Sequence, residues 1–415
     1  MPAIRLSKRD ALFDEAVRIL LEDLEPGSSL LLRHSVQLAG VGRFLASAEF
    51  LAQGSRLDLD RQAPLAGGSY EGVDGMGLFS ALRPAPELRR ATRFQINDAR
   101  IVLAHKLELV EGEKVVASAL LQRRLMAPGV LRIPVNEGRL RAVLFRPPPG
   151  VESGGALVDM FGTGGGLMEH RAALLASRGF TALALAIYDF QDRPRAVGEA
   201  LDLEYILEAI DWLSGSLGVA EVGVVGSSMG ATLALLCAVH SPRVKAVVAV
   251  NACHCLYNWQ PVTYKGRLLP SAAVDVRKSE ITSDGNVRLA NSMPPYDPAY
   301  AIPLQNSPKG TKILFAAGEK DGLQDSIAVL KALQSCMDAA GKSDDFESII
   351  YEGAGHLIEP PYQPHNGIVY YGILKMCADF GGETKEHCAA QLHFWPHLQH
   401  FLRRHLPPLP PLSKL

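Results

Sequence analysis

The sequence has few cysteines, no excess of charge of either sign and no long apolar run. Its 415 residues include 42 Lys and Arg against 44 Asp and Glu, which leaves a net charge of −2. This balance gives no electrostatic reason to expect binding to nucleic acid or to an anionic membrane. The six cysteines follow no framework spacing, which is typical of a reducing compartment. They are Cys237, Cys253, Cys255, Cys336, Cys377 and Cys388.

Targeting, membrane and metal signals are sparse as well. The first residues, MPAIRLSKRDALFDEAV, contain no apolar signal core, and their early acids argue against a transit peptide. No apolar run reaches transmembrane length, so we expect no integral membrane segment. The stretch Cys253-His254-Cys255 has one residue between its cysteines, unlike the usual zinc spacings, and we expect neither a metal nor a cofactor.

Two domains are expected, because 47% hydrophobic residues in a chain of this length exceed what one ordinary core holds. Short alternating segments such as SLLLRHSVQLAG fill the first third, and RIVLAHKLELVEGEKVVASALLQRRLM predicts two strands joined at Glu111-Gly112-Glu113. We predict a β-sandwich-like domain over residues 1–135. Another pair of strands turns at Asn136-Glu137-Gly138, and a loop rich in proline and glycine occupies 147–155.

Residues 136–412 predict an α/β domain with a mostly parallel, buried sheet. Apolar strands such as TALALAIYDF, VGVVG and VKAVVAVNA alternate with helical segments. Leu201, Tyr205, Ile206, Ile210 and Leu213 recur with the period of one helical face. The stretch 256–302 is rich in Pro, Asn, Asp and Ser and interrupts the alternation, so we expect a lid or cap there.

The octapeptide GVVGSSMG at 223–230 holds the pattern G-x-S-x-G with Ser228 at its centre. It lies between a predicted strand and a predicted helix, where a sharp turn exposes the central serine at the edge of the sheet. The flanking glycines are needed because side chains there would collide with the neighbouring backbone. We predict Ser228 as a nucleophile and Ser227 as a small residue that packs in the turn.

A serine needs a base, and an acid and a histidine follow in the order that α/β-hydrolases use. Asp321 comes just after the strand KILFAA, and His356 comes in Gly-Ala-Gly-His after the strand FESIIY. Strand ends of open α/β sheets gather active sites, so we predict that Asp321 orients His356 and that His356 activates Ser228. Glu319 and Asp325 remain rival acids.

A glycine-rich segment, Gly162-Thr163-Gly164-Gly165-Gly166, follows the first strand of the α/β domain. Its backbone N–H groups, together with that of Met229, would form an oxyanion hole. We predict Met229, Gly164 and Gly165 as its members. Dinucleotide binding is the rival interpretation, but the third glycine of that fingerprint is replaced by Leu167. A plain flexible turn is the other alternative.

Four segments together resemble a known family: DMFGTGGGL, the G-x-S-x-G turn, TYKGRLLP at 263–270 and GAGHLIEPPY at 353–362. They are similar to the type I acyl-CoA thioesterases, a family that also includes the bile acid-CoA:amino acid N-acyltransferases. The resemblance covers nearly the whole chain. It implies a hydrolase domain behind a β-sandwich and a nucleophile–Asp–His triad, which falls on Ser228, Asp321 and His356.

The residue at the nucleophile position separates the two branches of that family. The transferases carry cysteine and the thioesterases serine, so Ser228 implies hydrolysis of fatty acyl-CoA to free fatty acid and coenzyme A. N-acyl transfer to an amino acid is the alternative, and a non-enzymatic acyl-CoA carrier is a third hypothesis. Two departures concern the substrate: Met229 stands where many relatives have lysine, and GLQDS after the acid differs from the common pattern. Acyl-chain preference therefore stays open.

The last three residues, Ser413-Lys414-Leu415, match the tripeptide that the peroxisomal import receptor recognises. The preceding HLPPLPPL is rich in proline and therefore extended, which would let a receptor reach the tripeptide. We expect import into the peroxisome after synthesis in the cytosol.

Overall fold

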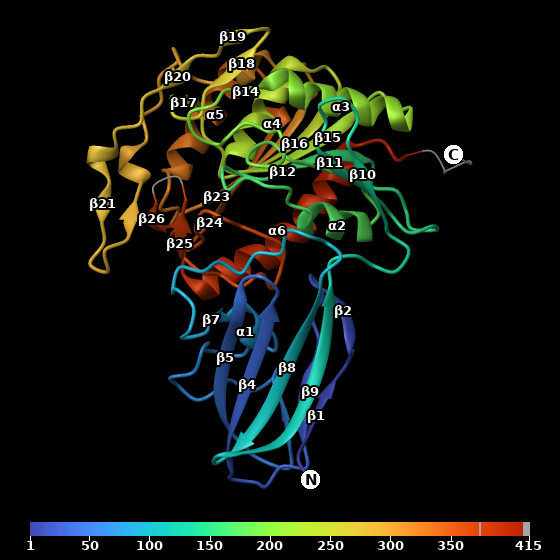
Figure 1. The fold of residues 1–415 in the computed structure, drawn as a ribbon, viewed down its shortest axis with the longest axis vertical. Coiled ribbons are helices and arrows are strands. Elements are labelled where there is room, and N and C mark those ends of the chain that lie inside the picture. The colour runs from blue at the N-terminus through green and yellow to red at the C-terminus, as the bar shows by residue number, and fades with distance from the viewer. Residues whose placement is uncertain (373–374, 410–415) are drawn as a thin grey trace.

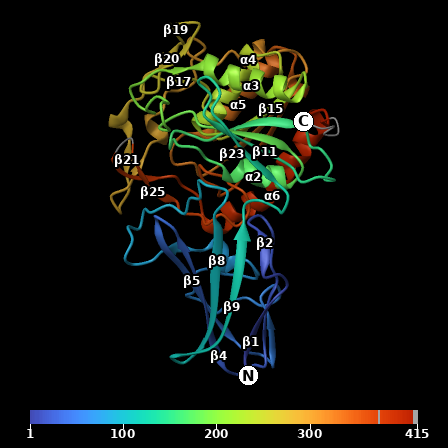
Figure 2. The same ribbon diagram turned by 45° about the vertical axis from the view of Figure 1, so that its right-hand side comes forward.

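The computed structural model describes residues 1–372 and 375–409, so the tripeptide at 413–415 lies outside the described residues. The chain forms two lobes along its long axis, a lobe of strands and a larger lobe of strands and helices (Figure 1). In Figure 2 the long strands of the first lobe run away from the second, and the N-terminus lies at the far end. This arrangement confirms the predicted fold class, an α/β domain preceded by a β-sandwich-like domain.

Two sheets build the N-terminal lobe, and all but one of their strand pairs are antiparallel. The smaller sheet has the order β1 (Ala3–Leu6), β3 (Ile19–Glu22), β6 (Arg56–Asp58). The larger has the order β2 (Asp10–Leu12), β9 (Lys114–Arg124), β8 (Val102–Glu111), β4 (Ser29–Leu38), β5 (Gly42–Leu51), β7 (Arg83–Pro84). A single-turn helix, α1 (Gly77–Ser80), accompanies them.

Alternation of buried and exposed residues drives these strands to pack on one face. In β4 every second residue is buried, including Leu30, Leu32 and Val36. They share one core with Leu21 and Leu57 of the smaller sheet, as the inner faces of a sandwich do. The turn between β8 and β9 lies at Glu111–Lys114 as predicted.

The second lobe is organised around one large sheet with the order β10-β11-β13-β12-β15-β16-β23-β24. The pairs β10–β11 and β11–β13 are antiparallel, and the remaining pairs are parallel. The strands are β10 (Leu131–Val135), β11 (Ala142–Arg146), β12 (Ala156–Met160), β13 (Thr181–Leu185), β15 (Val222–Ser227), β16 (Val244–Val250), β23 (Lys312–Gly318) and β24 (Phe346–Tyr351). Since β10 pairs in full with β11, the sheet starts at Leu131, inside the range predicted for the first domain.

Helices cover both faces of this sheet, which explains why its central parallel strands are buried along their whole length. α3 (Leu203–Leu217), α4 (Met229–His240) and α5 (Ser326–Ala339) share a core on one face. α2 (His170–Ser177) and α6 (Thr384–His405) lie on the other face, in the core that continues into the first lobe (Figure 1). No helix within residues 1–372 and 375–409 has the length and apolarity needed to cross a membrane.

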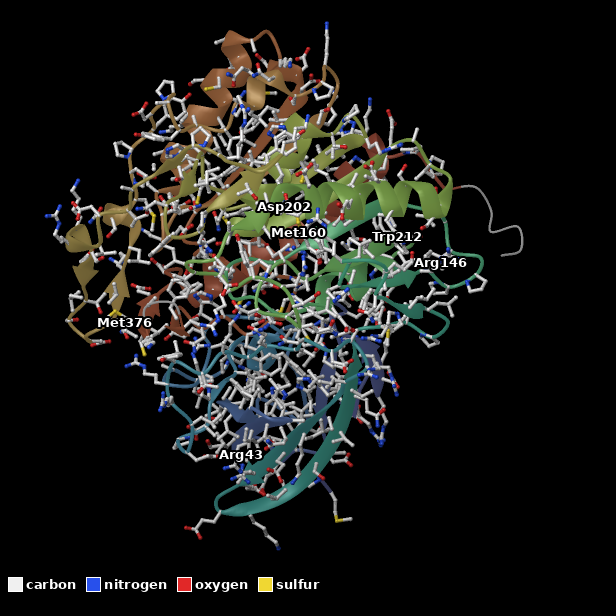
Figure 3. All side chains as sticks on the ribbon, turned by 45° about the horizontal axis from the view of Figure 1, so that its top comes forward. Arg43, Arg146, Met160, Asp202, Trp212 and Met376 are labelled. Atoms are coloured by element: carbon white, nitrogen blue, oxygen red, sulfur yellow. The ribbon has the colours of Figure 1, made fainter. Side chains whose placement is uncertain are left out.

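α3 illustrates how the sequence sets an element and its ends. Four of the five residues predicted to share one helical face lie in α3 and are buried: Tyr205, Ile206, Ile210 and Leu213. Leu201 is buried too, but it lies before the helix, in a short strand. Asp202 begins the helix, because its side chain accepts a hydrogen bond from the Glu204 N–H at 3.0 Å (Figure 3). Gly218 ends it in the left-handed region at φ 65°.

Small sheets surround the carboxyl edge of the large sheet. The expected lid segment 256–302 contributes short strands rather than a plain loop, and one four-stranded sheet joins it to the hairpin at 368–379. That sheet has the order β21 (Glu280–Ile281), β22 (Val287–Arg288), β26 (Met376–Asp379), β25 (Ile368–Tyr371). The others are β14 (Leu201–Asp202), β18 (Val262–Tyr264), β19 (Arg267–Leu268), and β17 (Leu256–Tyr257) with β20 (Ser271–Ala272).

A buried carboxylate joins the two lobes. Asp14 follows β2, and its side chain is 1% exposed. It accepts hydrogen bonds from Arg178 Nη2 at 2.7 Å and from Trp395 Nε1 at 2.8 Å. Arg178 ends α2 and Trp395 lies in α6, so one carboxylate of the first lobe fixes both helices on its side of the large sheet.

We predict that Asp14→Ala lowers the free energy of unfolding by about 3 kcal/mol, because it leaves the buried Trp395 N–H and Arg178 without their acceptor. Asp10→Ala is the matched control, since the Asp10 carboxylate is 51% exposed where it pairs with Arg124. It should cost less than about 1 kcal/mol. Urea denaturation measures both values, and equal losses would show that the buried carboxylate does not hold the lobes together.

Candidate active site

Ser228 stands alone between a strand and a helix. β15 ends at Ser227 and α4 begins at Met229, as the sequence predicted. Ser228 has φ 55° and ψ −127°, a positive φ that costs a non-glycine residue about 1–3 kcal/mol. Such strain persists only where the surrounding structure enforces it, so the turn is built to hold this serine.

Three glycines make the turn possible through close backbone contacts. A Cβ atom on Gly226 would lie 2.3 Å from the Gly230 carbonyl oxygen, and one on Gly230 would lie 2.3 Å from the Phe161 carbonyl oxygen. A Cβ atom on Gly162 would lie 2.9 Å from the Ser228 Cβ. The predicted need for glycine on both sides of the serine is therefore confirmed, and Gly162 brings the glycine-rich loop against Ser228.

Ser227 does more than the packing expected of it. Its hydroxyl is buried and accepts a hydrogen bond from Arg171 Nη1 at 2.5 Å. The same guanidinium donates to Asp159 Oδ1 at 2.6 Å and to the Met160 carbonyl oxygen at 2.8 Å. Met160 ends β12, in the middle of the molecule (Figure 3). Arg171 thus connects the end of β12, where the glycine-rich loop starts, to the turn that carries Ser228.

Asp321 and His356 lie together at the ends of their strands. His356 Nδ1 donates to Asp321 Oδ2 at 2.8 Å, and both side chains are almost fully buried. Asp321 also accepts from the Leu323 N–H at 2.8 Å, the Gln324 N–H at 3.3 Å and the Ser326 hydroxyl at 2.6 Å. Four hydrogen bonds therefore hold the carboxylate in a fixed position. His356 Nε2 is buried and has no hydrogen-bond partner within the described chain.

The rival acids have other roles in the structure. Asp325 is exposed and caps α5, where its carboxylate accepts from the Ala328 N–H at 2.9 Å. Glu319 is exposed and accepts from the Gly353 N–H at 3.0 Å. Neither carboxylate is hydrogen-bonded to His356, whose Nδ1 binds Asp321.

Asn251 is a supporting residue that sequence reasoning missed. It follows β16 with a positive φ of 49°, and its side chain is fully buried. Its amide nitrogen donates to the carbonyl oxygens of His356, at 2.6 Å, and Gly355, at 3.2 Å, and its amide oxygen accepts from the Gly318 N–H at 2.8 Å. One amide thus joins the strand before Asp321 to the loop of His356. Its place directly after a buried parallel strand was the available signal.

A cavity of about 550 Å³ opens above Ser228 and His356. Both lobes line it: Arg93 comes from the first, and Phe161, Leu323 and Tyr371 come from the second. Its described lining residues are Ala91, Thr92, Arg93, Gln95, Phe161, Gly162, Thr163, Gly164, Asp189, Arg195, Ala196, Val197, Ser228, Leu323, His356, Leu357, Val369, Tyr370, Tyr371, Gly372 and Phe380. No sequence pattern predicted that the segment 91–95 and the residues 369–372 would meet here.

The glycine-rich loop is placed differently from what we expected in one respect. Gly164 lines the cavity beside Gly162 and Thr163, but Gly165 does not. The Gly165 N–H instead closes a turn onto the Gly162 carbonyl oxygen at 3.3 Å. Within this loop Gly162 is the glycine that packs against Ser228. Met229 contributes the first N–H of α4, where the helix dipole favours negative charge.

Cys253 and Cys255 are buried beside the site. The Cys253 thiol donates to Gln324 Oε1 at 2.7 Å, and burial raises the pKa of Cys253 to about 11. Among the described residues no cluster of three or more His, Cys, Asp or Glu side chains could hold a metal ion. The two cysteines pack in a small buried cluster with Tyr257 and Ala272.

Comparisons with known proteins cover nearly the whole chain. Residues 201–408 match the family described as BAAT / Acyl-CoA thioester hydrolase C terminal, and residues 14–137 match Acyl-CoA thioester hydrolase/BAAT N-terminal region. Acyl-coenzyme A thioesterase 2, mitochondrial, of Rattus norvegicus is 35% identical over 405 residues, which are 95% of this chain and 87% of the relative.

Two further relatives match over similar lengths. Acyl-coenzyme A thioesterase 1 of Homo sapiens is 36% identical over 407 residues, covering 95% of this chain and 94% of the relative. Peroxisomal succinyl-coenzyme A thioesterase of Mus musculus is 32% identical over 406 residues, with the same coverage. The resemblance predicted from the sequence motifs is confirmed, and the chain belongs to the acyl-CoA thioester hydrolase/BAAT family.

Proposed function

We propose that this enzyme hydrolyses acyl-CoA thioesters through an acyl-enzyme on Ser228, with His356 as base and Asp321 as its orienting acid. One observation carries the proposal. His356 Nδ1 binds Asp321 at 2.8 Å, while its Nε2 is free of partners within the described chain. That imidazole lines the same cavity as the strained Ser228. Relatives named acyl-coenzyme A thioesterases support the substrate class.

In the first step His356 Nε2 takes the Ser228 proton while Oγ attacks the thioester carbonyl carbon. Asp321 keeps the imidazole in the tautomer with hydrogen on Nδ1 and stabilises the imidazolium that forms. The carbon–sulfur bond then breaks, the thiol of coenzyme A leaves with a proton from His356, and the acyl group stays on Ser228.

The negative charge on the carbonyl oxygen would be held by backbone N–H groups from two sides. The Met229 N–H at the start of α4 provides one, and the loop Gly162–Gly164 provides the other. We replace Gly165 by Gly162 in this role, because the Gly165 N–H is bonded within its own turn and Gly162 contacts Ser228. No metal or cofactor takes part in this scheme.

We predict that Ser228→Ala lowers kcat for palmitoyl-CoA hydrolysis by at least about a thousandfold, because no other group can form the ester. Release of free thiol measures the rate. Activity within tenfold of the unchanged enzyme would rule out Ser228 as the nucleophile. The same assay with glycine or taurine present, followed by mass spectrometry for an amide, tests the alternative of N-acyl transfer.

We predict that Ser227→Ala lowers kcat about tenfold with little change in KM, because Arg171 then no longer fixes the turn that carries Ser228. Ser214→Ala is the matched control, since its buried hydroxyl also accepts from an arginine, Arg243 Nη1, at 3.0 Å, but lies away from the cavity. The two variants should lose similar stability in thermal unfolding, and only Ser227→Ala should lose turnover. Equal kcat in both would assign Ser227 a purely structural role.

We further propose that the enzyme acts in the peroxisome. The terminal Ser413-Lys414-Leu415 supports this location, and one relative is named a peroxisomal thioesterase. A fluorescent protein fused before Met1 should collect in peroxisomes of transfected cells. Removing the last three residues should leave the fusion in the cytosol, and an unchanged distribution would contradict the assignment.

A further inference from the structure

A second, smaller cavity meets the first at the catalytic residues, and we call it the inner arm. It has a volume of about 30 Å³ and shares Thr163, Ser228, Leu323, His356 and Tyr371 with the large cavity. Its other walls come from the segment 253–260, from Leu289 and Met293, and from Met229 and Gln324. The catalytic pair therefore faces two spaces of different size, a wide one between the lobes and a narrow one inside the second lobe.

The inner arm has polar side chains among its apolar walls. Tyr257 is only 6% exposed, and neither its hydroxyl nor the Trp259 indole N–H has a hydrogen-bond partner within the described chain. Burial raises the pKa of Tyr257 well above its usual value, with the Cys253 thiol as a further cause, so the hydroxyl keeps its proton as a donor. Leaving two buried donors without partners costs about 1–3 kcal/mol each.

An acceptor also lies on this arm. The Gln260 amide nitrogen donates to the Thr163 hydroxyl at 3.0 Å, which fixes the amide and leaves its oxygen for another donor. Gln324 is engaged on both sides, because its nitrogen donates to the carbonyl oxygens of Asn251 and Ala252 and its oxygen accepts from Cys253. Besides Ser228 and His356 Nε2, the polar groups of the arm that are open to a ligand are thus two donors and one acceptor.

Size and charge select the molecule that such a space would hold. A cavity needs about 10–15 Å³ to hold one water, so this arm has room for one or two and for no long acyl chain. No lysine, arginine, aspartate or glutamate is among the described residues that line it. The charged carboxylate or sulfonate of an amino acid nucleophile would be buried there without a partner, which costs several kcal/mol.

We propose that the inner arm holds the water that resolves the acyl-enzyme, with Tyr257, Trp259 and Gln260 as its positioning residues. The inference rests on the proposed acyl-enzyme at Ser228. His356 Nε2 takes a proton from this water as its oxygen attacks the ester carbonyl carbon. The bond from that carbon to Ser228 Oγ then breaks, the proton passes from His356 to Oγ, and a free carboxylic acid leaves.

This arrangement separates the two nucleophiles that the family uses. The thioester enters from the large cavity, and water waits in the narrow arm on the other side of the catalytic pair. An amino acid would have to enter through the large cavity, where the acyl-CoA itself must bind. The geometry therefore favours hydrolysis over amide formation for a reason independent of the serine itself.

The test is a single-turnover experiment with Tyr257→Phe, which removes one hydroxyl and keeps the ring. Enzyme in excess is mixed with palmitoyl-CoA and quenched in acid at intervals. Free coenzyme A reports acylation, and the mass of the intact protein reports formation and decay of acyl-Ser228. We expect decay of the adduct to slow about tenfold while the acylation rate stays within twofold. Trp259→Phe should likewise slow decay of the adduct and leave the acylation rate nearly unchanged.

Tyr264→Phe is the control, since Tyr264 lies in the same segment of the chain but outside both cavities. It should leave both rates unchanged. Equal slowing of both steps in Tyr257→Phe, or no change in decay, overturns the proposal, as does a change in acylation alone, which would place the acyl chain in the arm. If the unchanged enzyme forms no adduct at Ser228 at all, the proposed function fails instead.

Discussion

The backbone conformation at Ser228 depends on three close contacts that leave no room for a side chain at the glycines involved. The strand β15, the helix α4 and the loop after β12 come together so tightly that a methyl group on Gly226, Gly230 or Gly162 would overlap backbone or the serine itself. This contact forces the positive φ of Ser228 and aims the helix N-terminus at the same point. The partial positive charge at the start of α4, the backbone strain at Ser228 and the position of the Ser228 hydroxyl thus follow from one packing arrangement.

Buried polar side chains hold the strand ends of this arrangement in place. Arg171 joins Ser227 to the end of β12, and Asn251 joins the strand before Asp321 to the loop of His356. Each of these side chains bridges two strand ends that are distant in sequence. A polar group buried so deeply is tolerated only when its hydrogen bonds are satisfied, and here they are satisfied by the elements that must stay in register.

The first lobe takes part in the site rather than standing apart from it. Its core is continuous with that of α2 and α6, and the Asp14 carboxylate holds both helices. The segment that leaves this lobe places Arg93 over the Phe161 ring, 5.1 Å from its centre, at the mouth of the large cavity. Residues of both lobes therefore line the large cavity beside Ser228.

The sequence by itself determined the fold class and pointed to Ser228, Asp321 and His356 as the candidate triad, because both inferences depend on local patterns. Apolar strands that alternate with helices predict a parallel sheet. Residues that directly follow such strands lie at one edge of the sheet, as Asp321 and His356 do. Only the tertiary structure decided that Gly162 rather than Gly165 packs against Ser228 and that β10 belongs to the large sheet. It also decided that Tyr257 and Trp259 line the inner arm. These features depend on which atoms of distant segments come into contact, and a one-dimensional pattern carries no distance between them.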